Sequence, residues 1–360
     1  MGQPSPYYRH FPLAALLRRL AGMLPVAQML IVDDEPSVRD VMSRWAALLG
    51  LRPHTAASAD EALDAVSAHR CDLAVIDVMM PGHDGFWLAG ELQRGHPSTA
   101  VVIVTGHTEL LRSESSPPLA DLLIKPFPRE RFAIAVDRGR HWHRQVVEDL
   151  EWHTRLSREI DDQVVEVCGD LARLRERGID ETAALLALAD ERALDLAGHG
   201  DRVARLSVLA ARALRLDEAT VALAEQAARL HDVGKIAMPE ALITKPSALS
   251  PGEIRLMQRH VDAGASILAA TASLSHLAPI VGASHERFGG GGYSRGLAGA
   301  AIPLASRIIG VADAYDAMTS DRPYRRRLDS AEAAAEVLRC APSQFDPAVV
   351  VAFMTVVGRP

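Results

Sequence analysis

The sequence predicts a multidomain protein in which an α/β part, built on a doubly wound parallel sheet, precedes an all-helical part. Between residues 29 and 124, short apolar runs alternate with helical stretches, which is typical of strands separated by helices. From residue 181 onward every strong segment has helical periodicity, and none has the alternation of a strand. A length of 360 residues also favours about two or three domains.

Composition sets limits on the class of protein. Hydrophobic residues make up 48% of the chain, which is enough for ordered cores. The net charge of −7 offers no basic surface for general nucleic-acid binding, so we expect no DNA partner. The three cysteines are scattered and odd in number, which favours a reducing, cytoplasmic compartment over a disulfide framework. No run of about 18 apolar residues occurs, so we expect no membrane span.

Residues 1–27 precede the first predicted strand. An apolar stretch within them is followed by Arg18 and Arg19 rather than by a small-residue cleavage site, so we expect no signal peptide. We interpret residues 1–27 as a disordered or amphipathic leader, or as translation from a mis-assigned start, with Met23 and Met29 as alternative starts.

Polar side chains follow each of four predicted parallel strands. The strands are 29–32, 74–76, 100–104 and 122–124, and the residues that follow are Asp33 with Asp34, Asp77, Thr105 and Lys125. The carboxyl ends of parallel strands meet at one edge of a sheet, so we expect these side chains to converge. Converging carboxylates need a cation, and oxygen ligands favour Mg²⁺. One carboxylate could then attack a phosphoryl group whose oxygens Thr105 and Lys125 hold. Solvated turns would explain one such acidic residue but not the whole set.

Four short segments resemble the response-regulator receiver domain, over residues 28–137. They are Ile31-Val32-Asp33-Asp34-Glu35-Pro36, Val75-Ile76-Asp77-Val78-Met79-Met80-Pro81-Gly82, Thr105 and Lys125-Pro126-Phe127. The resemblance implies a five-stranded sheet, phosphorylation of Asp77 by a sensor histidine kinase, and a cis bond before Pro126. It also implies Mg²⁺ held by Asp33, Asp34 and Asp77. The chain departs from the pattern at Leu122, where receiver domains usually carry an aromatic residue that moves with the threonine.

Residues 138–180 are predicted to form a linker of one long helix or two abutting helices, because Pro and Gly are almost absent before Gly178. Apolar residues recur near heptad spacing from Leu156 to Leu174, which indicates a parallel coiled coil that joins two copies of the chain. The alternative is an amphipathic helix that lies on the next domain.

Residues 181–360 are predicted to be an all-helical domain. Its predicted helices are 181–197, 201–215, 217–230, 250–270, 275–284, 303–319 and 330–339. The helix 217–230 leads directly to His231 and Asp232, whose imidazole nitrogen and carboxylate oxygen suit divalent metals such as Mn or Fe(II). Lys235 then places a cation where an anionic substrate bound to the metal would meet it.

Further histidines and carboxylates lie on apolar helices or at their ends. They are Asp195, His199, His260, His285 and Asp313. A spacing of four places Asp195 and His199 on one face of a helix, where both could reach one ion. A single histidine of this kind is more simply explained as a hydrogen-bonded polar group. Four of them on apolar helices are hard to bury without a shared purpose.

Three segments resemble the HD superfamily of metal-dependent phosphohydrolases, and within it the HD-GYP subfamily, over residues 181–355. They are His231-Asp232-Val233-Gly234-Lys235-Ile236, the loop from Gly289 to Leu297, and the stretch from Asp313 to Arg325. The resemblance implies hydrolysis of cyclic di-GMP at two or three metal ions. It implies one ion held by His199, His231, Asp232 and Asp313, and a second held by Asp232, His260 and His285.

The same resemblance implies roles for residues beside the metals. Water acidified by the metal would attack phosphorus, while Lys235 and Asp232 take part in catalysis. Tyr293, Arg322 and Arg325 match positions that bind the substrate, the two arginines through its phosphates.

The chain departs from the subfamily at four positions. Ser284 stands where the first of two adjacent histidines is usual, so the second ion loses a donor. Gly289 and Ser294 replace the usual Asp and Pro of the signature loop. Asp195 stands where members able to hold a third metal carry Glu, which is one methylene longer.

We therefore expect a response regulator, phosphorylated on Asp77, that controls hydrolysis of cyclic di-GMP. We expect two divalent transition metals, Fe or Mn, in the helical domain and Mg²⁺ in the receiver. The expected assembly is a homodimer through the linker helix, with diguanylate cyclase-type proteins as further partners. The alternative is a catalytically weak or inactive HD-GYP module that binds cyclic di-GMP or a partner protein, as Ser284 and the altered loop suggest. A third hypothesis is hydrolysis of another nucleotide.

Overall fold

A computed structural model describes residues 27–106, 118–191, 196–320 and 327–357. Residues 1–26 of the predicted leader therefore lie outside the described part. By its internal contacts the chain divides into two units, Met1–Glu151 and Trp152–Pro360. Helix α5 (Arg129–Glu176) begins in the first unit and ends in the second.

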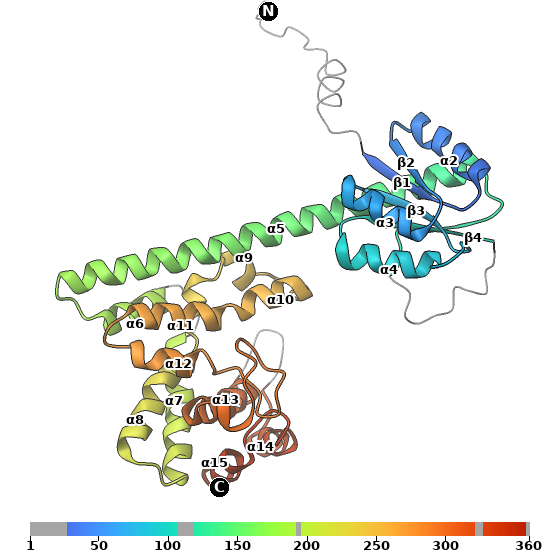
Figure 1. Cartoon of the computed structure of the whole chain (residues 1–360). Helices are drawn as coiled ribbons and strands as arrows, with labels where there is room; N and C mark the ends of the chain where they lie inside the picture. The colour runs from blue at the N-terminus through green and yellow to red at the C-terminus, as the bar shows by residue number, and fades with distance from the viewer. Residues whose placement is uncertain (1–26, 107–117, 192–195, 321–326, 358–360) are drawn as a thin grey trace, which may run out of the picture. The chain divides into compact units, whose positions relative to one another are not determined.

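The first unit is built on a five-stranded parallel sheet (Figure 1). Its strands are β1 (Gln28–Val32), β2 (Arg52–Ala56), β3 (Leu73–Asp77), β4 (Ala100–Thr105) and β5 (Asp121–Ile124), in the order β2-β1-β3-β4-β5. All neighbouring strands pair in parallel. The predicted doubly wound sheet of five strands is confirmed. The predicted strands do not include β2, because only its last residue, Ala56, is buried and the strand has no apolar run.

Helices cover both faces of this sheet, which explains why β3 and β4 are buried along their whole length. On one face the apolar side chains pack with α3 (Ala59–Ala68) and α4 (Gly85–Gly95). On the other face they pack with α2 (Pro36–Leu48) and with the start of α5, where Phe132 is fully buried. The edge at which the strands end is left open between these layers, and it carries the predicted acidic residues.

Helix α5 is one continuous helix, which is the first of the two predicted alternatives. It ends before Gly178, whose φ of +70° is the left-handed conformation that favours glycine after a helix. The backbone N–H groups of Gly178 and Ile179 close the last turn by donating to the carbonyl oxygens of Arg175 and Leu174.

The apolar stripe that predicts a coiled coil on α5 packs instead within its own chain. Leu156, Ile160 and Leu171 are at most 2% exposed and belong to the core of the second unit, and Val164 and Val167 pack against that core. Helix α5 is therefore an amphipathic helix that lies on the next domain, which is the alternative to the predicted coiled coil. The stripe is already covered, so self-association through α5 would have to use another face of the helix.

In the described residues of the second unit, all regular secondary structure is helical, as predicted. Its α-helices after α5 are α6 (Glu181–Glu191), α7 (Leu196–Ala213), α8 (Glu218–Leu230), α9 (Glu240–Ile243), α10 (Pro251–Gln258), α11 (His260–Ala270), α12 (Ala278–Val281), α13 (Leu304–Thr319), α14 (Ser330–Arg339) and α15 (Pro347–Val357). Short 3-10 segments occupy Val233–Ala237, Ser275–Leu277 and Gly299–Ala301. The predicted helix 250–270 is two helices, α10 and α11, and the predictions do not include α15.

A close backbone contact positions the segment after α8. The 3-10 segment Val233–Ala237 packs directly on α11, and a side chain at Gly234 would collide with the carbonyl oxygen of His260 and the backbone nitrogen of Gly264. Only glycine fits there, since it has no Cβ. The contact holds His231 and Asp232 beside the first turn of α11.

Helix α5 is also tied to the start of α11 by polar contacts. Arg259 donates to Ser157 Oγ at 2.7 Å and pairs with Asp161 at 2.5 Å, both on α5. Within the described ranges, no helix is long and apolar enough to cross a membrane.

The packing of α5 predicts a contrast between one of its buried residues and an exposed residue elsewhere in the same unit. Ile160→Ala removes a side chain that is 1% exposed and should lower the free energy of unfolding of the helical unit by about 2–5 kcal/mol. Val351→Ala, on a residue of α15 that is 65% exposed, should change it by less than about 0.5 kcal/mol. Urea unfolding followed by circular dichroism measures both. Equal losses for the two variants would contradict the described packing.

Candidate metal centre and phosphorylation site

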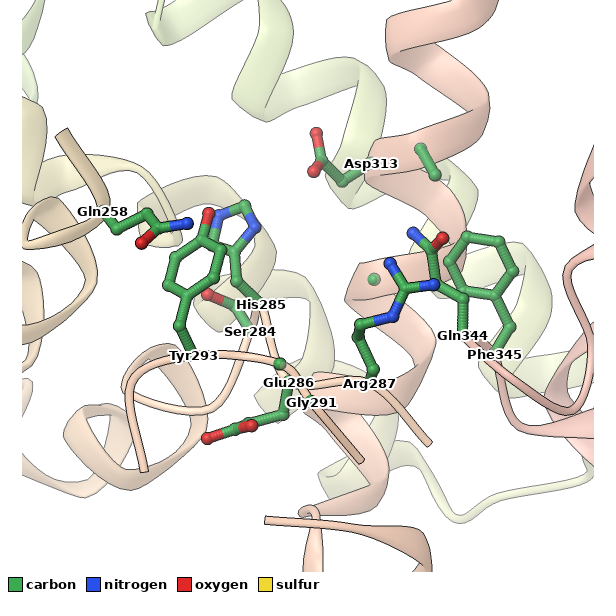
Figure 2. A pocket seen from close by; sticks show the side chains of 13 residues that line it. Gln258, Ser284, His285, Glu286, Arg287, Gly291, Tyr293, Asp313, Gln344 and Phe345 are labelled. Carbon is green, nitrogen blue, oxygen red and sulfur yellow. The ribbon is translucent and has the colours of Figure 1, made fainter. Parts of the chain in front are cut away.

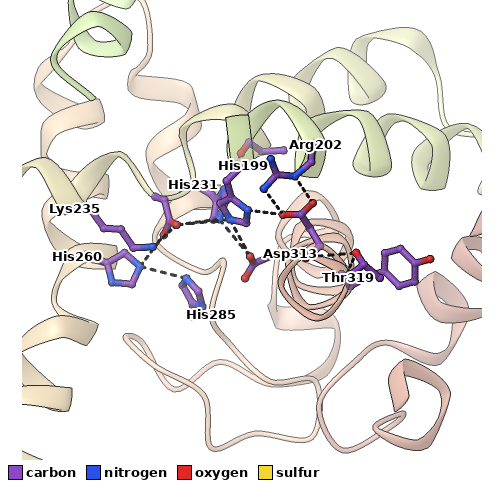
Figure 3. Close-up of polar contacts among 12 residues, drawn as sticks. His199, Arg202, His231, Lys235, His260, His285, Asp313 and Thr319 are labelled. Atoms are coloured by element: carbon purple, nitrogen blue, oxygen red, sulfur yellow. Dashed lines mark hydrogen bonds and ion pairs between the residues drawn. The ribbon is translucent and has the colours of Figure 1, made fainter. Parts of the chain in front are cut away.

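Two groups of histidine and aspartate side chains lie next to each other in the helical unit (Figure 3). The first group is His199 on α7, His231 after α8 and Asp313 on α13; the second is Asp232, His260 on α11 and His285 after α12. Within each group, one ligand atom from every residue lies within 4.8 Å of the others. The structure thus brings together the six predicted ligands from segments far apart in the chain.

Asp232 lies between the two groups. Its Oδ2 is 3.6 Å from Nε2 of His231 and 3.8 Å from Nε2 of His199, while its Oδ1 is 3.2 Å from Nε2 of His260. Burial alone would raise the pKa of Asp232, but His231, Lys235 and His260 hold that pKa well below its ordinary range. Asp232 is therefore a buried anion with one oxygen directed to each group.

His231 and His260 direct their Nε2 atoms toward this centre. Nδ1 of His231 lies 2.7 Å from the carbonyl oxygen of Ala228, and Nδ1 of His260 lies 2.8 Å from that of Met257. A carbonyl oxygen can only accept, so each Nδ1 carries a proton, and in the neutral ring the Nε2 atom is then the one that can bind a metal ion.

The centre leaves two buried atoms unsatisfied. Nε2 of His231 and Oδ1 of Asp232 have no hydrogen-bond partner among the described residues. Buried polar atoms are normally partnered. Imidazole nitrogen and carboxylate oxygen are a donor set for divalent transition metals, so these residues fit bound cations.

His199 is held by two carboxylates. Its Nδ1 is 2.7 Å from Asp316 and its Nε2 is 3.2 Å from Asp313. Burial would lower the pKa of His199, but hydrogen bonds to Asp313 and Asp316 raise it to about 9. Burial likewise would raise the pKa of Asp313, yet the bond to His199 lowers it to about 2. This part of the centre strongly favours a positive charge, which a proton or a metal ion can supply.

Asp316 and Arg202 support His199 and were not among the predicted site residues. Asp316 accepts hydrogen bonds from Arg202 at 2.7 and 3.1 Å in addition to its bond with His199. Arg202 lies three residues after His199, and Asp316 lies three residues after Asp313, so each shares a helix face with a predicted ligand. The spacing places each residue beside a ligand, but it does not predict their contact with each other, which forms only where α7 and α13 meet.

His285 is held in a neutral form by its surroundings. Burial lowers the pKa of His285 to about 4, and repulsion from His260 adds to the effect. Its ring stacks on Tyr293, with ring centroids 5.2 Å apart and an angle of 7° between the planes. Its Nε2 lies 3.3 Å from Nε2 of His260. Tyr293 therefore fixes the orientation of a ligand that is available to bind metal.

Ser284 lies beside His285 but its hydroxyl is engaged elsewhere. The residue is 4% exposed, and its Oγ donates to the carbonyl oxygen of Val281 at 2.8 Å. The serine therefore does not direct its hydroxyl proton at the metal groups. Three other predicted site residues, Asp195, Arg322 and Arg325, lie outside the described residues.

The acidic edge of the sheet forms a second site. Lys125 Nζ is 2.8 Å from Asp33 Oδ2 and 2.9 Å from Asp77 Oδ1, and carboxylate oxygens of Asp33, Asp34 and Asp77 lie within 4.8 Å of one another. Burial raises the pKa of Asp77, although Lys125 opposes the shift. Thr105 is buried beside Lys125. The backbone N–H of Lys125 donates to the carbonyl oxygen of Thr105 at 2.8 Å.

This arrangement has the features that the receiver resemblance implies. The bond between Lys125 and Pro126 is cis, as expected. Three oxygen donors with a lysine beside them can hold a hard cation and a phosphoryl group on one carboxylate.

Fold and sites together define a class of protein: a receiver domain followed by a helical domain with a histidine-aspartate metal centre. The response regulator receiver domain family matches residues 29–137, and the HD domain family matches residues 168–349. The chain is 30% identical, over 91% of its length, to a cyclic di-GMP phosphodiesterase of Thermotoga maritima, of which it covers 89%. It is 31% identical, over 91% of its length, to the cyclic di-GMP phosphodiesterase response regulator RpfG of Xanthomonas campestris pv. campestris, of which it covers 86%.

A shorter match extends over the helical part. The chain is 36% identical, over 44% of its length, to the 3'3'-cGAMP-specific phosphodiesterase 3 of Vibrio cholerae, of which it covers 35%. From these matches, the chain belongs to the family of response regulators in which a receiver domain precedes an HD domain.

Asp316→Asn should weaken metal binding at the first group. The amide lacks the negative charge that orients His199 and raises its basicity, and loss of such a supporting group typically costs about 10- to 100-fold in metal affinity. Calorimetric titration of metal-depleted protein with Mn²⁺ measures the effect. Asp262→Asn, on an exposed carboxylate of α11, is the matched control. Unchanged affinity in Asp316→Asn would contradict the role given to this carboxylate.

Proposed function

We propose that this protein is a response regulator whose helical domain hydrolyses cyclic di-GMP under control of phosphorylation at Asp77. The observation that carries the proposal is the position of Asp232, which directs one oxygen to each group of potential metal ligands. Such a bridging carboxylate suits two cations held close together, the arrangement that stabilises displacement at a phosphodiester. The relatives named cyclic di-GMP phosphodiesterase support the choice of substrate.

The ligand assignment is part of this proposal. His199, His231, Asp232 and Asp313 would hold one ion, and Asp232, His260 and His285 the other. We propose Fe or Mn for both, since imidazole with carboxylate suits these metals. Asp195 is a candidate ligand for a third ion. Bound ions would supply acidified water and neutralise phosphate charge.

The chain's own residues then bind and orient the substrate. Lys235 Nζ lies 2.5 Å from Asp232 Oδ2, which places its charge at the centre, where it can neutralise a phosphoryl oxygen. Beside the centre, a cavity of about 300 Å³ is open to a ligand (Figure 2). Tyr293 forms one wall, and we propose that Arg322 and Arg325 hold the phosphates from a segment next to α13 in the chain.

The receiver domain implies an upstream kinase that phosphorylates it. We propose that this partner is a sensor histidine kinase and that Mg²⁺ joins Asp33, Asp34 and Asp77 during transfer to Asp77. Residues 28–137 would act as the receiver, 138–180 as the linker and 181–360 as the HD-GYP output, with 1–27 as a leader. Three free cysteines suit a cytoplasmic location.

Self-association is a further part of the proposal. We propose a homodimer through the face of α5 opposite its buried stripe, where Val165 is 73% exposed. Diguanylate cyclase-type proteins are the proposed further partners. Neither interaction requires the face that packs against the core.

A second candidate function is a catalytically weak or inactive module that binds cyclic di-GMP or a partner protein. The observation that favours it is Ser284, whose hydroxyl donates to the backbone instead of supplying a ligand for the second group. The second group then has one aspartate and two histidines, which would hold its ion less tightly.

Protein loaded with Mn²⁺ or Fe²⁺ should cleave cyclic di-GMP, and Ser284→His should raise the activity and the metal content. An added imidazole beside His285 would strengthen the second group, by about 10-fold if its effect matches that of other metal-supporting residues. Chromatography of the products and elemental analysis measure both. Asp232→Asn, which removes the bridging carboxylate, should be inactive. If the wild type and Ser284→His both leave the nucleotide intact over hours, the proposed phosphodiesterase activity is contradicted and the binding module is the favoured function.

Asp77→Asn should abolish phosphorylation by a small phosphoryl donor such as acetyl phosphate, since the amide is not a nucleophile. Gel electrophoresis that retards phosphoproteins measures the modified fraction. Asp60→Asn, on an exposed aspartate of α3, should be modified like the wild type. If Asp77→Asn is phosphorylated to the wild-type extent, Asp77 is not the phosphorylated residue.

A further inference from the structure

The cavity beside the metal centre has a second polar end that hydrolysis itself does not require. Its lining includes His285 and Tyr293 near the metals and, elsewhere on its wall, Arg287, Gln344 and Phe345. Figure 2 shows the polar ends of Arg287 and Gln344 pointing into the same space, next to the ring of Phe345. A ligand held at the metals would therefore meet these three side chains with another part of its structure.

Arg287 and Gln344 are not engaged in strong polar contacts in the described part of the protein, where the charge of Arg287 acts on the Cys340 thiol and favours its ionised form. No hydrogen bond or ion pair joins the side chains of Arg287 or Gln344 to another described residue, whereas neighbouring charged groups are paired. Arg307, for example, binds Asp346 at 2.5 Å. A guanidinium and an amide that face a cavity without partners keep their full hydrogen-bonding capacity for a ligand.

The backbone holds Arg287 and Gln344 in register with each other. The N–H of Phe288, next to Arg287, donates to the carbonyl oxygen of Gln344 at 2.9 Å, and the N–H of Gly289 donates to that of Ser343 at 3.0 Å. A Cβ at Gly289 would lie only 2.8 Å from the Ser343 carbonyl oxygen, so glycine permits this approach. The two side chains are thus built into one arrangement by two segments more than fifty residues apart.

We propose that Arg287 and Gln344 recognise a guanine base of the dinucleotide and so determine base specificity. The inference rests on the proposed function, because the phosphodiester at the metals places a base in the same cavity. Guanine presents two adjacent acceptors, O6 and N7, which match the paired N–H groups of a guanidinium. Adenine places an amino donor at the position of O6, which would face the arginine with like hydrogen-bond polarity.

Gln344 and Phe345 complete the recognition. The amide of Gln344 can donate to or accept from a base edge, so it adjusts to the groups beside O6 and N7. The ring of Phe345, which is 6% exposed, gives the cavity an apolar wall against which a flat base can pack. Lys235, together with the cations that the centre would hold, would supply positive charge for the phosphate, which leaves Arg287 available for the base.

The test is equilibrium binding of hydrolysis-resistant phosphorothioate analogues of cyclic di-GMP and cyclic di-AMP to the Mn²⁺-loaded full chain. We expect the wild type to prefer the guanine analogue. Arg287→Ala should lower the affinity for the guanine analogue by about 10- to 100-fold. It should change the affinity for the adenine analogue by less than about 3-fold. Gln344→Ala should have a smaller effect in the same direction.

Matched controls are Arg205→Ala on α7 and Gln226→Ala on α8, both exposed, which should bind like the wild type. Metal content and circular dichroism confirm that each variant is folded. Arg287→Lys keeps the charge but replaces the rigid planar fork by a single flexible ammonium, so it should reduce the guanine preference without abolishing binding.

Equal weakening of both analogues in Arg287→Ala would overturn the inference and make Arg287 a phosphate contact. Absence of a guanine preference in the wild type would overturn it too. The proposed hydrolysis is tested separately. If the protein cleaves no cyclic di-GMP but prefers guanine in a way that depends on Arg287, the base recognition is supported and the proposed enzymatic activity is contradicted.

Discussion

The helical domain depends on one buried anion. Asp232 is 6% exposed, lies within 4 Å of His199, His231 and His260, and pairs with Lys235. A carboxylate removed from water is costly unless positive charge surrounds it. The elements that converge on it, the end of α8 and the starts of α7 and α11, therefore satisfy an electrostatic demand as well as an apolar one. The glycine contact between Gly234 and Gly264 makes that convergence sterically possible.

Orientation of the imidazoles is achieved by three different means. His231 and His260 donate to backbone carbonyl oxygens within their own helical turns, so their tautomer follows directly from local structure. His199 depends on the side chain of Asp316, which Arg202 holds in turn. His285 depends on ring stacking with Tyr293, in a loop whose sequence departs from its subfamily. The second group is therefore the more sensitive of the two to sequence change.

The sequence predicts the fold and the positions of most site residues because both follow local rules. Apolar runs that end in polar residues indicate the sheet, and the paired motifs around Asp77 and His231 indicate the sites. Three features follow no local rule. Strand β2 has no apolar run because it lies at the sheet edge. The heptad spacing on α5 cannot distinguish a second copy of the chain from the bundle, since both bury the same stripe. Asp316 and Arg202 acquire their role only when α7 and α13 meet.

Helix α5 contributes to two separate cores, with Phe132 in the sheet unit and Leu156, Ile160 and Leu171 in the helical unit. The boundary between the two domains therefore does not coincide with either end of this helix. Cutting the chain at residue 180, where a linker would conventionally end, would strip three large side chains from the output domain and leave Arg259 without Ser157 and Asp161. An autonomous output fragment would have to carry the second half of α5 with it, as part of its own architecture.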